Sequence, residues 1–357
     1  MRALRIYAGP RARRQLESEG LQPAQVRVIP AAAGGPKGLI FGPFDRYLFG
    51  HWLARATHEV HLVGASIGAW RMATACLDDP VAGFERLERD YIRQHYEPEP
   101  GRRRPSARQV SERFGASLQD FYGDRIGGLL RHPRYRLHVF TARGRHLLAR
   151  EHRLRTPLGY LGAFVANGLH RRALGGWIER VVFSTPGSVL PFATDDYRTR
   201  RVDLVEDNFR SALQASCSIP FVLQSVTGIP GAPAGAYWDG GITDYHLHLN
   251  YAPDERGLVL YPHFQRAVVP GWLDKGLKWR HKATHFLDDV VLLAPDPAWV
   301  RQLPNGKLPD RNDFVRYGTD LQARVRAWSA AASASVQLAE EFARWAENPT
   351  MEQVEAL

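Results

Sequence analysis

The sequence predicts an α/β protein with a mainly parallel central sheet and helices on its faces. Residues 26–32 (VRVIPAA) and 59–64 read as buried strands, and each is followed by a glycine turn and a helical segment. Strands that alternate with helices in this way form parallel sheets covered by those helices. With 357 residues, the chain is also long enough to bury a large core.

The remaining elements follow from hydrophobic periodicity and from stop signals along the chain. Helices are predicted over 38–49, 67–77 and 320–347, and the region 81–130 is predicted to be mainly helical. Further strands are predicted over 135–142, 179–185, 257–262 and 289–294. No internal repeat interrupts this order, so the elements belong to one fold rather than to an array.

The chain divides into residues 1–300, which are expected to form the main domain, and a helical extension at 301–357. The apolar stripe of the 320–347 helix is expected to pack on the body of the same chain. A homodimer seam along this stripe stays open as the alternative.

Composition limits the classes of protein that fit. The formal net charge is +10, but only five of the 47 basic residues are lysine, and an arginine bias of this kind is weak evidence for an acidic partner. No nucleic-acid-binding pattern is present.

The N-terminal segment carries arginines where a secretory signal needs an apolar stretch, so we expect a cytoplasmic protein. Two cysteines are too few for a disulfide framework.

A serine corner stands at the end of the second strand. Gly64-Ala65-Ser66-Ile67-Gly68 fits the G-x-S-x-G pattern, in which small residues let a strand and a helix approach closely at a tight turn. Such a turn holds the serine hydroxyl at the N-terminus of the next helix, where developing negative charge is favoured. The pattern therefore indicates a nucleophile at Ser66.

Two further glycine motifs supply chemistry that a serine nucleophile needs. Gly34-Gly35-Pro36-Lys37-Gly38 follows the first strand, and the N–H groups of Gly34 and Gly35 can be aimed at an oxyanion without a side chain in the way. Trp238-Asp239-Gly240-Gly241 places a carboxylate on flexible backbone, where it could accept the serine proton.

In their order and spacing, these motifs resemble the patatin-like phospholipase family over roughly residues 24–250. The stretch Ala215-Ser216-Cys217-Ser218-Ile219-Pro220 also resembles the A-S-x-x-x-P segment that precedes D-G-G in that family. The resemblance implies a three-layer α/β/α sandwich and a Ser–Asp dyad without a catalytic histidine, acting on lipid or other carboxylic esters through an acyl-enzyme.

The resemblance also implies the role of each site residue. Ser66 is the nucleophile and Asp239 the base. The oxyanion and substrate-binding positions are Gly34, Gly35, Lys37, Gly38 and Ile67. No cofactor or metal is expected. Many family members have arginine where Lys37 stands here, which leaves open how the oxyanion loop is braced.

Three other interpretations stay open. A Ser–His–Asp triad on an α/β-hydrolase is possible in chain order, because His246, His248 and His263 follow Asp239. Acyl transfer to an alcohol would use the same residues as hydrolysis. A non-catalytic lipid-binding protein on the same scaffold is the third, and the intact Ser66 and Asp239 argue against it.

One stretch suggests a lipid surface as a partner. Residues 125–155 are rich in arginine and run into an apolar segment, PLGYLGAFVANGL, at 157–169. Positive charge beside exposed apolar residues suits peripheral contact with an anionic membrane. A solvated arginine-rich face is the alternative.

Overall fold

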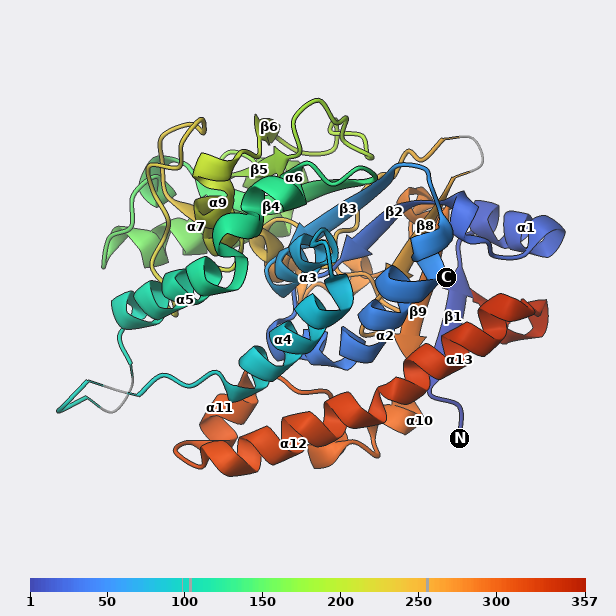
Figure 1. Ribbon diagram of the computed structural model, residues 1–357. Helices are drawn as coiled ribbons and strands as arrows, with labels where there is room; N and C mark the ends of the chain where they lie inside the picture. The colour runs from blue at the N-terminus through green and yellow to red at the C-terminus, as the bar shows by residue number, and fades with distance from the viewer. Residues whose placement is uncertain (98, 103–104, 255–256) are drawn as a thin grey trace.

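One sheet runs through the computed structural model, which describes residues 1–97, 99–102, 105–254 and 257–357 (Figure 1). Ten strands of these residues lie in the order β10-β1-β9-β8-β2-β3-β4-β5-β6, and β7 pairs with β4. Their bounds are β1 Leu4–Ala8, β2 Val26–Ala31, β3 Val60–Ala65, β4 Tyr135–Gly144, β5 Ile178–Ser184, β6 Thr199–Asp203, β7 Tyr237–Asp239, β8 Leu258–Pro262, β9 Val290–Pro295 and β10 Val354–Ala356. Only the β1–β9, β4–β5 and β4–β7 pairs of the described strands are antiparallel.

The connections place helices on both faces of this sheet. The crossovers from β2 to β3 and from β3 to β4 run in the same direction, so right-handed connections bring their helices to one face. In Figure 1, α2, α3 and α4 lie on this face, toward the viewer. The crossover from β8 to β9 runs the opposite way and covers the other face. The expected mainly parallel α/β fold, with three layers, is confirmed.

The α-helices of the described residues are α1 Pro10–Glu19, α2 Gly42–Tyr47, α3 Ile67–Ala75, α4 Pro80–Arg93, α5 Ala107–Tyr122, α6 Ile126–Leu130, α7 Arg155–Leu169, α8 Arg171–Leu174, α9 Glu206–Ser216, α10 Pro297–Val300, α11 Asn312–Tyr317, α12 Leu321–Ala334 and α13 Val336–Glu347. The expected helical region at 81–130 corresponds to α4, α5 and α6. Within it, residues 98, 103 and 104 lie outside the described part of the chain.

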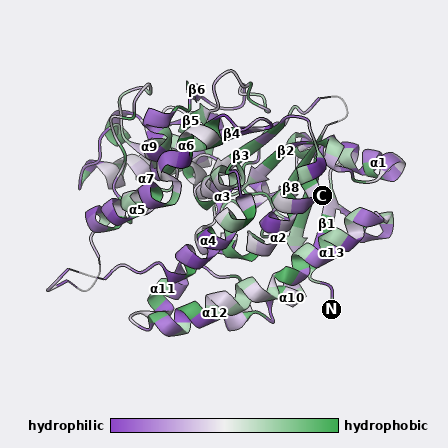
Figure 2. Cartoon of the chain, in the orientation of Figure 1, coloured by the Kyte–Doolittle hydropathy of each residue, from purple (hydrophilic) through white to green (hydrophobic). Residues whose placement is uncertain are grey.

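The core lies along the central strands. Every residue of β8 and β9 is buried, and β2 and β3 are buried at all but one position each. Figure 2 shows these strands in the green of hydrophobic residues. A strand covered on both sides has no solvent face, which explains why the sequence shows continuous apolar runs here instead of alternation.

Two predicted helices differ from the structure. The segment predicted as one helix over 38–49 is a 3₁₀ helix at Gly35–Phe41, followed by the short α2 and a π-helical turn. Glycine and proline in this segment disfavour a regular α-helix. The predicted 320–347 helix is interrupted at Ser335, whose hydroxyl donates to the Ala332 carbonyl at 2.6 Å. A serine that bonds to backbone in this way competes with the helix.

Residues 301–357 pack against the rest of the chain. Trp328, Phe342 and Trp345 from α12 and α13 are buried, so the apolar stripe that was the candidate dimer seam is covered by the chain itself. Strand β10 pairs with β1, which places the end of this segment in the central sheet. The division into 1–300 and 301–357 stays a prediction.

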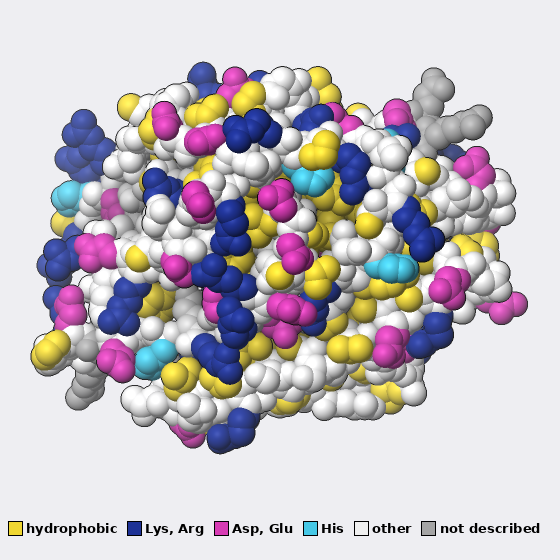
Figure 3. All heavy atoms as spheres, viewed as in Figure 1, with side chains coloured by type: hydrophobic (Ala, Val, Ile, Leu, Met, Phe, Trp, Pro, Cys, Tyr) yellow, Lys and Arg dark blue, Asp and Glu magenta, His cyan; other side chains and the backbone are white. Residues whose placement is uncertain are grey.

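Charged side chains of both signs lie on the face in view. Figure 3 shows Lys and Arg side chains gathered in a column down the middle of this face, with acidic side chains beside it. No helix in the described part of the chain is long and apolar enough to cross a membrane.

Candidate active site

Ser66 occupies a strained corner between β3 and α3. Its backbone has φ 56° and ψ −129°, a conformation that L-residues rarely adopt. The chain can turn this sharply because Gly68 lies against β2: a Cβ at position 68 would stand 1.8 Å from the Ala31 carbonyl oxygen. The predicted strand, serine corner and helix are all present in the structure.

The backbone of Ser66 is held from a distant part of the chain. Its N–H donates to the hydroxyl of Ser216 at 2.9 Å, and its carbonyl accepts from Ala69 at the start of α3. Ser66 is 4% exposed. Its hydroxyl therefore sits at the N-terminus of a helix and in a largely dry environment, two conditions that strengthen the interaction of a helix dipole with a developing charge.

The glycine turn after β2 presents backbone donors. Within the described residues, the N–H groups of Gly34 and Gly35 donate to no protein atom. Gly35 has φ +56°, which favours glycine, and a Cβ there would lie 3.3 Å from Nε of Arg311. Lys37 lies over the ring of Phe264, with Nζ 5.7 Å from the ring centroid. Burial lowers the pKa of the Lys37 ammonium.

The turn is braced against the serine corner by a buried ion pair. Arg71 on α3 donates to the Asp45 carboxylate on α2 through Nε (2.7 Å) and Nη2 (2.8 Å). Close packing adds to this, because a Cβ at Gly38 would meet the Ile67 side chain at 3.0 Å. A bidentate pair fixes orientation as well as distance. The pair ties α2, which follows the glycine turn, to α3, which follows Ser66.

Asp239 ends β7 and faces the serine. Its Oδ1 accepts the N–H of Gly241 at 2.8 Å, whereas its Oδ2 is buried and has no hydrogen-bond partner among the described residues. Burial raises the pKa of Asp239, although the charge of Arg311, the nearby Ser66 hydroxyl and the Gly241 N–H oppose the shift. A carboxylate with a raised pKa and a free oxygen is well suited to accept a proton.

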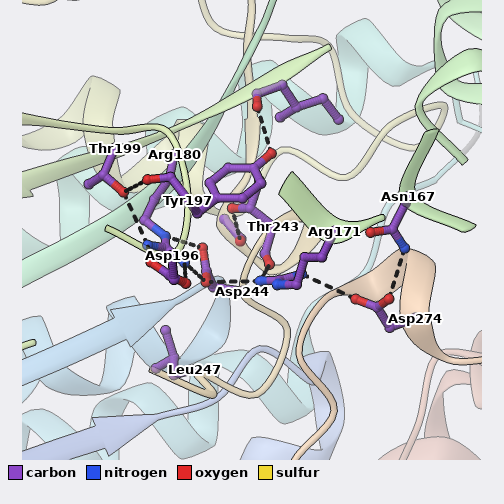
Figure 4. A network of polar contacts seen from close by, with 12 residues as sticks. Asn167, Arg171, Arg180, Asp196, Tyr197, Thr199, Thr243, Asp244, Leu247 and Asp274 are labelled. Atoms are coloured by element: carbon purple, nitrogen blue, oxygen red, sulfur yellow. Dashed lines mark hydrogen bonds and ion pairs between the residues drawn. The ribbon is translucent and has the colours of Figure 1, made fainter. Parts of the chain in front are cut away.

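The chain that follows Asp239 is anchored by a charged network (Figure 4). Arg180 on β5 is completely buried and donates to both oxygens of Asp244, through Nε at 2.8 Å and Nη2 at 2.6 Å. Arg171 donates to the Thr243 carbonyl at 2.7 Å and bridges to Asp274 at 3.2 Å. These contacts fix the loop that carries the D-G-G motif.

A pocket of about 220 Å³ opens over these groups. Of the predicted site residues, Gly34, Lys37 and Asp239 line it, whereas Ser66, Gly35, Gly38 and Ile67 are not among its lining residues. Lys275 and Arg311 also line it, and the sequence analysis missed both of them. The scarcity of lysine was a signal that could have singled out Lys275, because two of the five lysines, Lys37 and Lys275, reach this one pocket.

The candidate histidines lie apart from the serine and the aspartate. Across the described residues, no histidine is hydrogen-bonded to Ser66 or Asp239. His246 and His263 are packed against one another, with ring centroids 4.3 Å apart, and burial lowers both pKa values. His248 instead contacts Thr284 at 3.0 Å. No group of three or more His, Cys, Asp or Glu side chains in the described ranges is arranged to hold a metal ion.

Comparisons with known proteins find a family model that matches the chain and a solved structure that resembles it. The family model described as patatin-like phospholipase matches residues 54–246, which is more than half of the chain. The crystal structure of VipD from Legionella pneumophila is similar at 13% identity and a TM-score of 0.36, covering 89% of this chain and 67% of that one. A comparison with curated proteins finds no match. The matched range contains Ser66 and Asp239 but neither Lys275 nor Arg311.

Proposed function

The chain belongs to the patatin-like phospholipase family, and from this premise we propose that it is a serine acyl hydrolase with a Ser66–Asp239 dyad. Membership supports hydrolysis of lipid esters in general. The assignment to a dyad is carried by one observation: Oδ2 of Asp239, a carboxyl whose pKa the nearby Ser66 hydroxyl lowers, is buried and without a hydrogen-bond partner in the described residues.

The proposed reaction has two halves. In the first, Ser66 Oγ attacks the ester carbonyl carbon while its proton passes to Asp239. The C–O bond then breaks, and the alcohol leaves with that proton. In the second half, Asp239 takes a proton from water, the resulting hydroxide attacks the acyl-enzyme, and the serine regains a proton as the acid is released.

The tetrahedral intermediates of both halves carry an oxyanion. In this proposal the N–H groups of Gly34 and Gly35 stabilise it, together with the N–H of Ile67 at the start of α3. The oxyanion loop is expected to contribute much of the rate, since an aspartate is a weak base at its ordinary pKa of about 3.9. The raised pKa of Asp239 reduces this mismatch.

The experiment that tests the function is labelling with a fluorophosphonate probe, followed by assay on a panel of esters. The wild-type chain should be labelled at Ser66, and Ser66→Ala should lose both labelling and hydrolysis. Labelling of the variant at another residue would place the nucleophile elsewhere. Product analysis with an added alcohol separates hydrolysis from acyl transfer, and a folded, unlabelled wild type would favour a lipid-binding protein.

The proposal includes a lipid surface, because helix α7 leaves an apolar face uncovered. Six apolar side chains in and beside it are between 50% and 82% exposed: Leu154, Leu158, Leu161, Phe164, Val165 and Leu169. Tyr160 of the same helix contacts the ring of Phe221, which is itself exposed and follows Pro220 in the pocket wall. Phe221 therefore places an exposed apolar side chain next in sequence to the pocket wall.

Charge near α7 favours an anionic lipid surface. The helix contains no aspartate or glutamate, and Arg150, Arg153 and Arg155 at its N-terminal side are exposed and form no ion pair with described residues. Arg143 and Arg145, by contrast, bond to Glu179 and to the Gly175 carbonyl. The arginines proposed to face lipid are therefore those next to α7, a subset of the 125–155 segment.

A further inference from the structure

Arg311 brings a positive charge from the C-terminal part of the chain to the oxyanion turn. The residue lies outside the range 54–246 that the family model matches. Its Nε stands 3.3 Å, and its Cγ 3.7 Å, from the position that a Cβ on Gly35 would take. The side chain also lines the pocket that contains Asp239. The guanidinium therefore lies beside the proposed oxyanion donors and in the same pocket as the proposed base.

No ion pair neutralises this guanidinium. Within the described residues, the Arg311 side chain forms neither a hydrogen bond nor a salt bridge. The acid next to it in sequence, Asp310, is already engaged: it accepts from Lys307 Nζ at 2.7 Å and from the Asn312 N–H at 2.8 Å. Burial raises the pKa of Asp239, and the charge of Arg311 is the largest contribution that lowers it. The charge of Arg311 therefore acts on the reacting groups without being cancelled by a partner.

The turn that carries Arg311 is held by the residues on either side of it. The Asp310 N–H donates to the Asp313 carboxylate at 3.0 Å, and the Asn312 N–H donates to Asp310 at 2.8 Å. Asp313 is buried and also accepts from the Trp328 indole at 2.9 Å. The Arg311 side chain is itself exposed and lines the pocket, so a bound substrate can contact it.

The proposed reaction moves a negative charge within this pocket. As Ser66 Oγ bonds to the ester carbon, the electrons of the carbonyl double bond pass to the carbonyl oxygen, and the serine proton passes to Asp239. The carboxylate becomes neutral, and the negative charge now lies on the oxyanion beside Gly34 and Gly35. A cation that lies against Gly35 gains attraction as this charge develops, and such a gain lowers the barrier.

The two lysines of the pocket are less suited to this role. Burial, with the charges of Arg311 and Lys37, lowers the pKa of the Lys275 ammonium to about 8, so it starts to lose its charge in mildly alkaline solution. Burial also lowers the pKa of Lys37, whose Nζ lies over the ring of Phe264. A guanidinium keeps its charge at every pH at which enzymes work, and it presents its N–H donors in a fixed fork.

We propose that Arg311 is a further catalytic residue, whose guanidinium contacts the oxyanion and stabilises it together with the N–H groups of Gly34 and Gly35. The inference rests on the proposed function and adds to it a residue from outside the range matched by the family model. The contact strengthens only when negative charge reaches the carbonyl oxygen, so its loss should lower kcat and leave KM nearly unchanged.

The test compares Arg311→Met with Arg316→Met, which removes the same charge from an exposed position on α11 outside the pocket. Hydrolysis of para-nitrophenyl butyrate is measured on the plateau of each pH profile, where Asp239 is fully ionised. Arg311→Met should lower kcat by about 10-fold or more, which is less than the ~100-fold typical of a buried oxyanion donor because water and salt screen an exposed charge. Arg316→Met should keep the wild-type kcat, and Arg311→Lys, which retains a positive charge, should restore part of the rate.

The sign of the change separates this role from an effect on the base. Loss of Arg311 should raise the pKa of Asp239, and a stronger base would by itself raise the plateau rate, so a fall in kcat reports the oxyanion. Chemical rescue is the second measurement. Guanidinium chloride, added well below denaturing concentrations, should raise the activity of Arg311→Ala several-fold. Sodium chloride at the same ionic strength should not.

Two results would overturn the inference. One is a kcat of Arg311→Met that equals or exceeds the wild-type value while circular dichroism shows the variant folded. The other is a change confined to KM, without rescue of Arg311→Ala by guanidinium, because Arg311 would then contact the substrate only in its ground state. Failure of the proposed function is recognised separately, since Ser66 would then escape fluorophosphonate labelling even in wild type.

Discussion

The backbone N–H of Ser66 donates to the hydroxyl of Ser216 across 2.9 Å, although 150 residues separate the two in sequence. Two residues further on, the Ser218 carbonyl accepts the backbone N–H of Asp239, also at 2.9 Å. One short segment at the C-terminal end of α9 therefore holds both members of the proposed dyad. This explains in physical terms why an A-S-x-x-x-P stretch accompanies the G-x-S-x-G and D-G-G motifs.

Ser216→Ala should lower kcat by about 5- to 100-fold with little change in KM, because it leaves the buried N–H of Ser66 without an acceptor. Ser216→Thr keeps the hydroxyl and should restore most of the rate. Steady-state kinetics on a soluble ester measure the effects on kcat and on KM separately. Ser218→Ala is the matched control, since among the described residues its hydroxyl bonds only to the Gln214 carbonyl, and the Ser218 carbonyl remains in the variant. Equal losses in both alanine variants would show a general loosening of the segment.

Asp239→Asn should reduce kcat by at least about 100-fold, as removal of a general base does, while the isosteric amide preserves the fold. The comparison is with His246→Gln and His263→Gln, which should keep activity close to wild type. Both histidines are buried, and burial lowers their pKa values, so neither is expected to be charged at neutral pH. A folded but inactive histidine variant would instead support the Ser–His–Asp triad.

Gly35→Ala should lower kcat by about 100-fold or more. The added methyl group would stand 3.3 Å from Arg311 Nε and would strain a residue at φ +56°, so the oxyanion donors would shift. Gly187→Ala provides the control: Gly187 also has a positive φ (+75°), but a Cβ there meets nothing within 4 Å. Thermal unfolding of both variants separates backbone strain from loss of the oxyanion site. Similar activity in the two variants would contradict an oxyanion role for this turn.

The pH dependence of kcat/KM should report Asp239. The carboxyl acts as a base only when ionised, so the rate rises with pH through its pKa. Burial raises that pKa, which places the rise at higher pH than for an ordinary aspartate near 3.9. Four groups oppose the shift by favouring the ionised form: Arg311, Lys275, the Ser66 hydroxyl and the Gly241 N–H.

Replacing one of these groups gives the sign of the effect. Arg311→Met removes the strongest of the opposing contributions, so the pKa of Asp239 should rise further and the acid limb of the kcat/KM profile should move to higher pH. Arg316→Met removes the same charge outside the pocket and should leave the acid limb of the kcat/KM profile at its wild-type pH. An acid limb that moves to lower pH in Arg311→Met would exclude Asp239 as the titrating base.

Binding to anionic vesicles should depend on the arginines beside α7. Replacing Arg150, Arg153 and Arg155 with serine should weaken binding at low salt, because each arginine near an anionic surface contributes about 1 kcal/mol. Leu158→Ser should weaken it at both low and high salt. Co-sedimentation measures both, and hydrolysis of a soluble ester should stay near wild type.

The control for the loss of three positive charges is a second triple variant. It replaces three exposed arginines away from α7 with serine: Arg14, Arg301 and Arg326. This control variant should bind vesicles as wild type does. Equal weakening in both triple variants would indicate attraction by net charge alone, and a dimer that dissociates in Leu158→Ser would assign the apolar face to a second copy of the chain.

Much of the site could be predicted because it is built from local patterns. The corner at Ser66 needs small residues because β3, α3 and β2 lie close together there. The five consecutive residues of the G-x-S-x-G motif show this requirement in the sequence. The turn at Gly34 and the strand end at Asp239 carry similarly compact signals. Each motif marks a place where backbone must approach backbone, and glycine is the residue that allows it.

The rest depends on contacts that no local pattern encodes. Arg311 reaches the pocket only because residues 301–357 fold back over the oxyanion loop, and nothing in its neighbouring residues indicates that partner. Strands β6, β7 and β10 are polar or only three to five residues long and exist because another strand pairs with them. The break at Ser335 was hidden by the regular apolar spacing on both sides of it.

Strand β10 bears on whether the central sheet can pair edge to edge with another copy of the chain. It covers the outer edge of β1, and Glu355 within it pairs with Arg5 at 2.9 Å. A three-residue edge strand that bears a charge is a poor template for a neighbouring chain, whereas the five apolar-rich residues of β1 would be a good one. Loss of Val354–Ala356 would therefore leave the outer edge of β1 free to pair with a neighbouring chain. Light scattering should then detect concentration-dependent aggregation before any change occurs at Ser66.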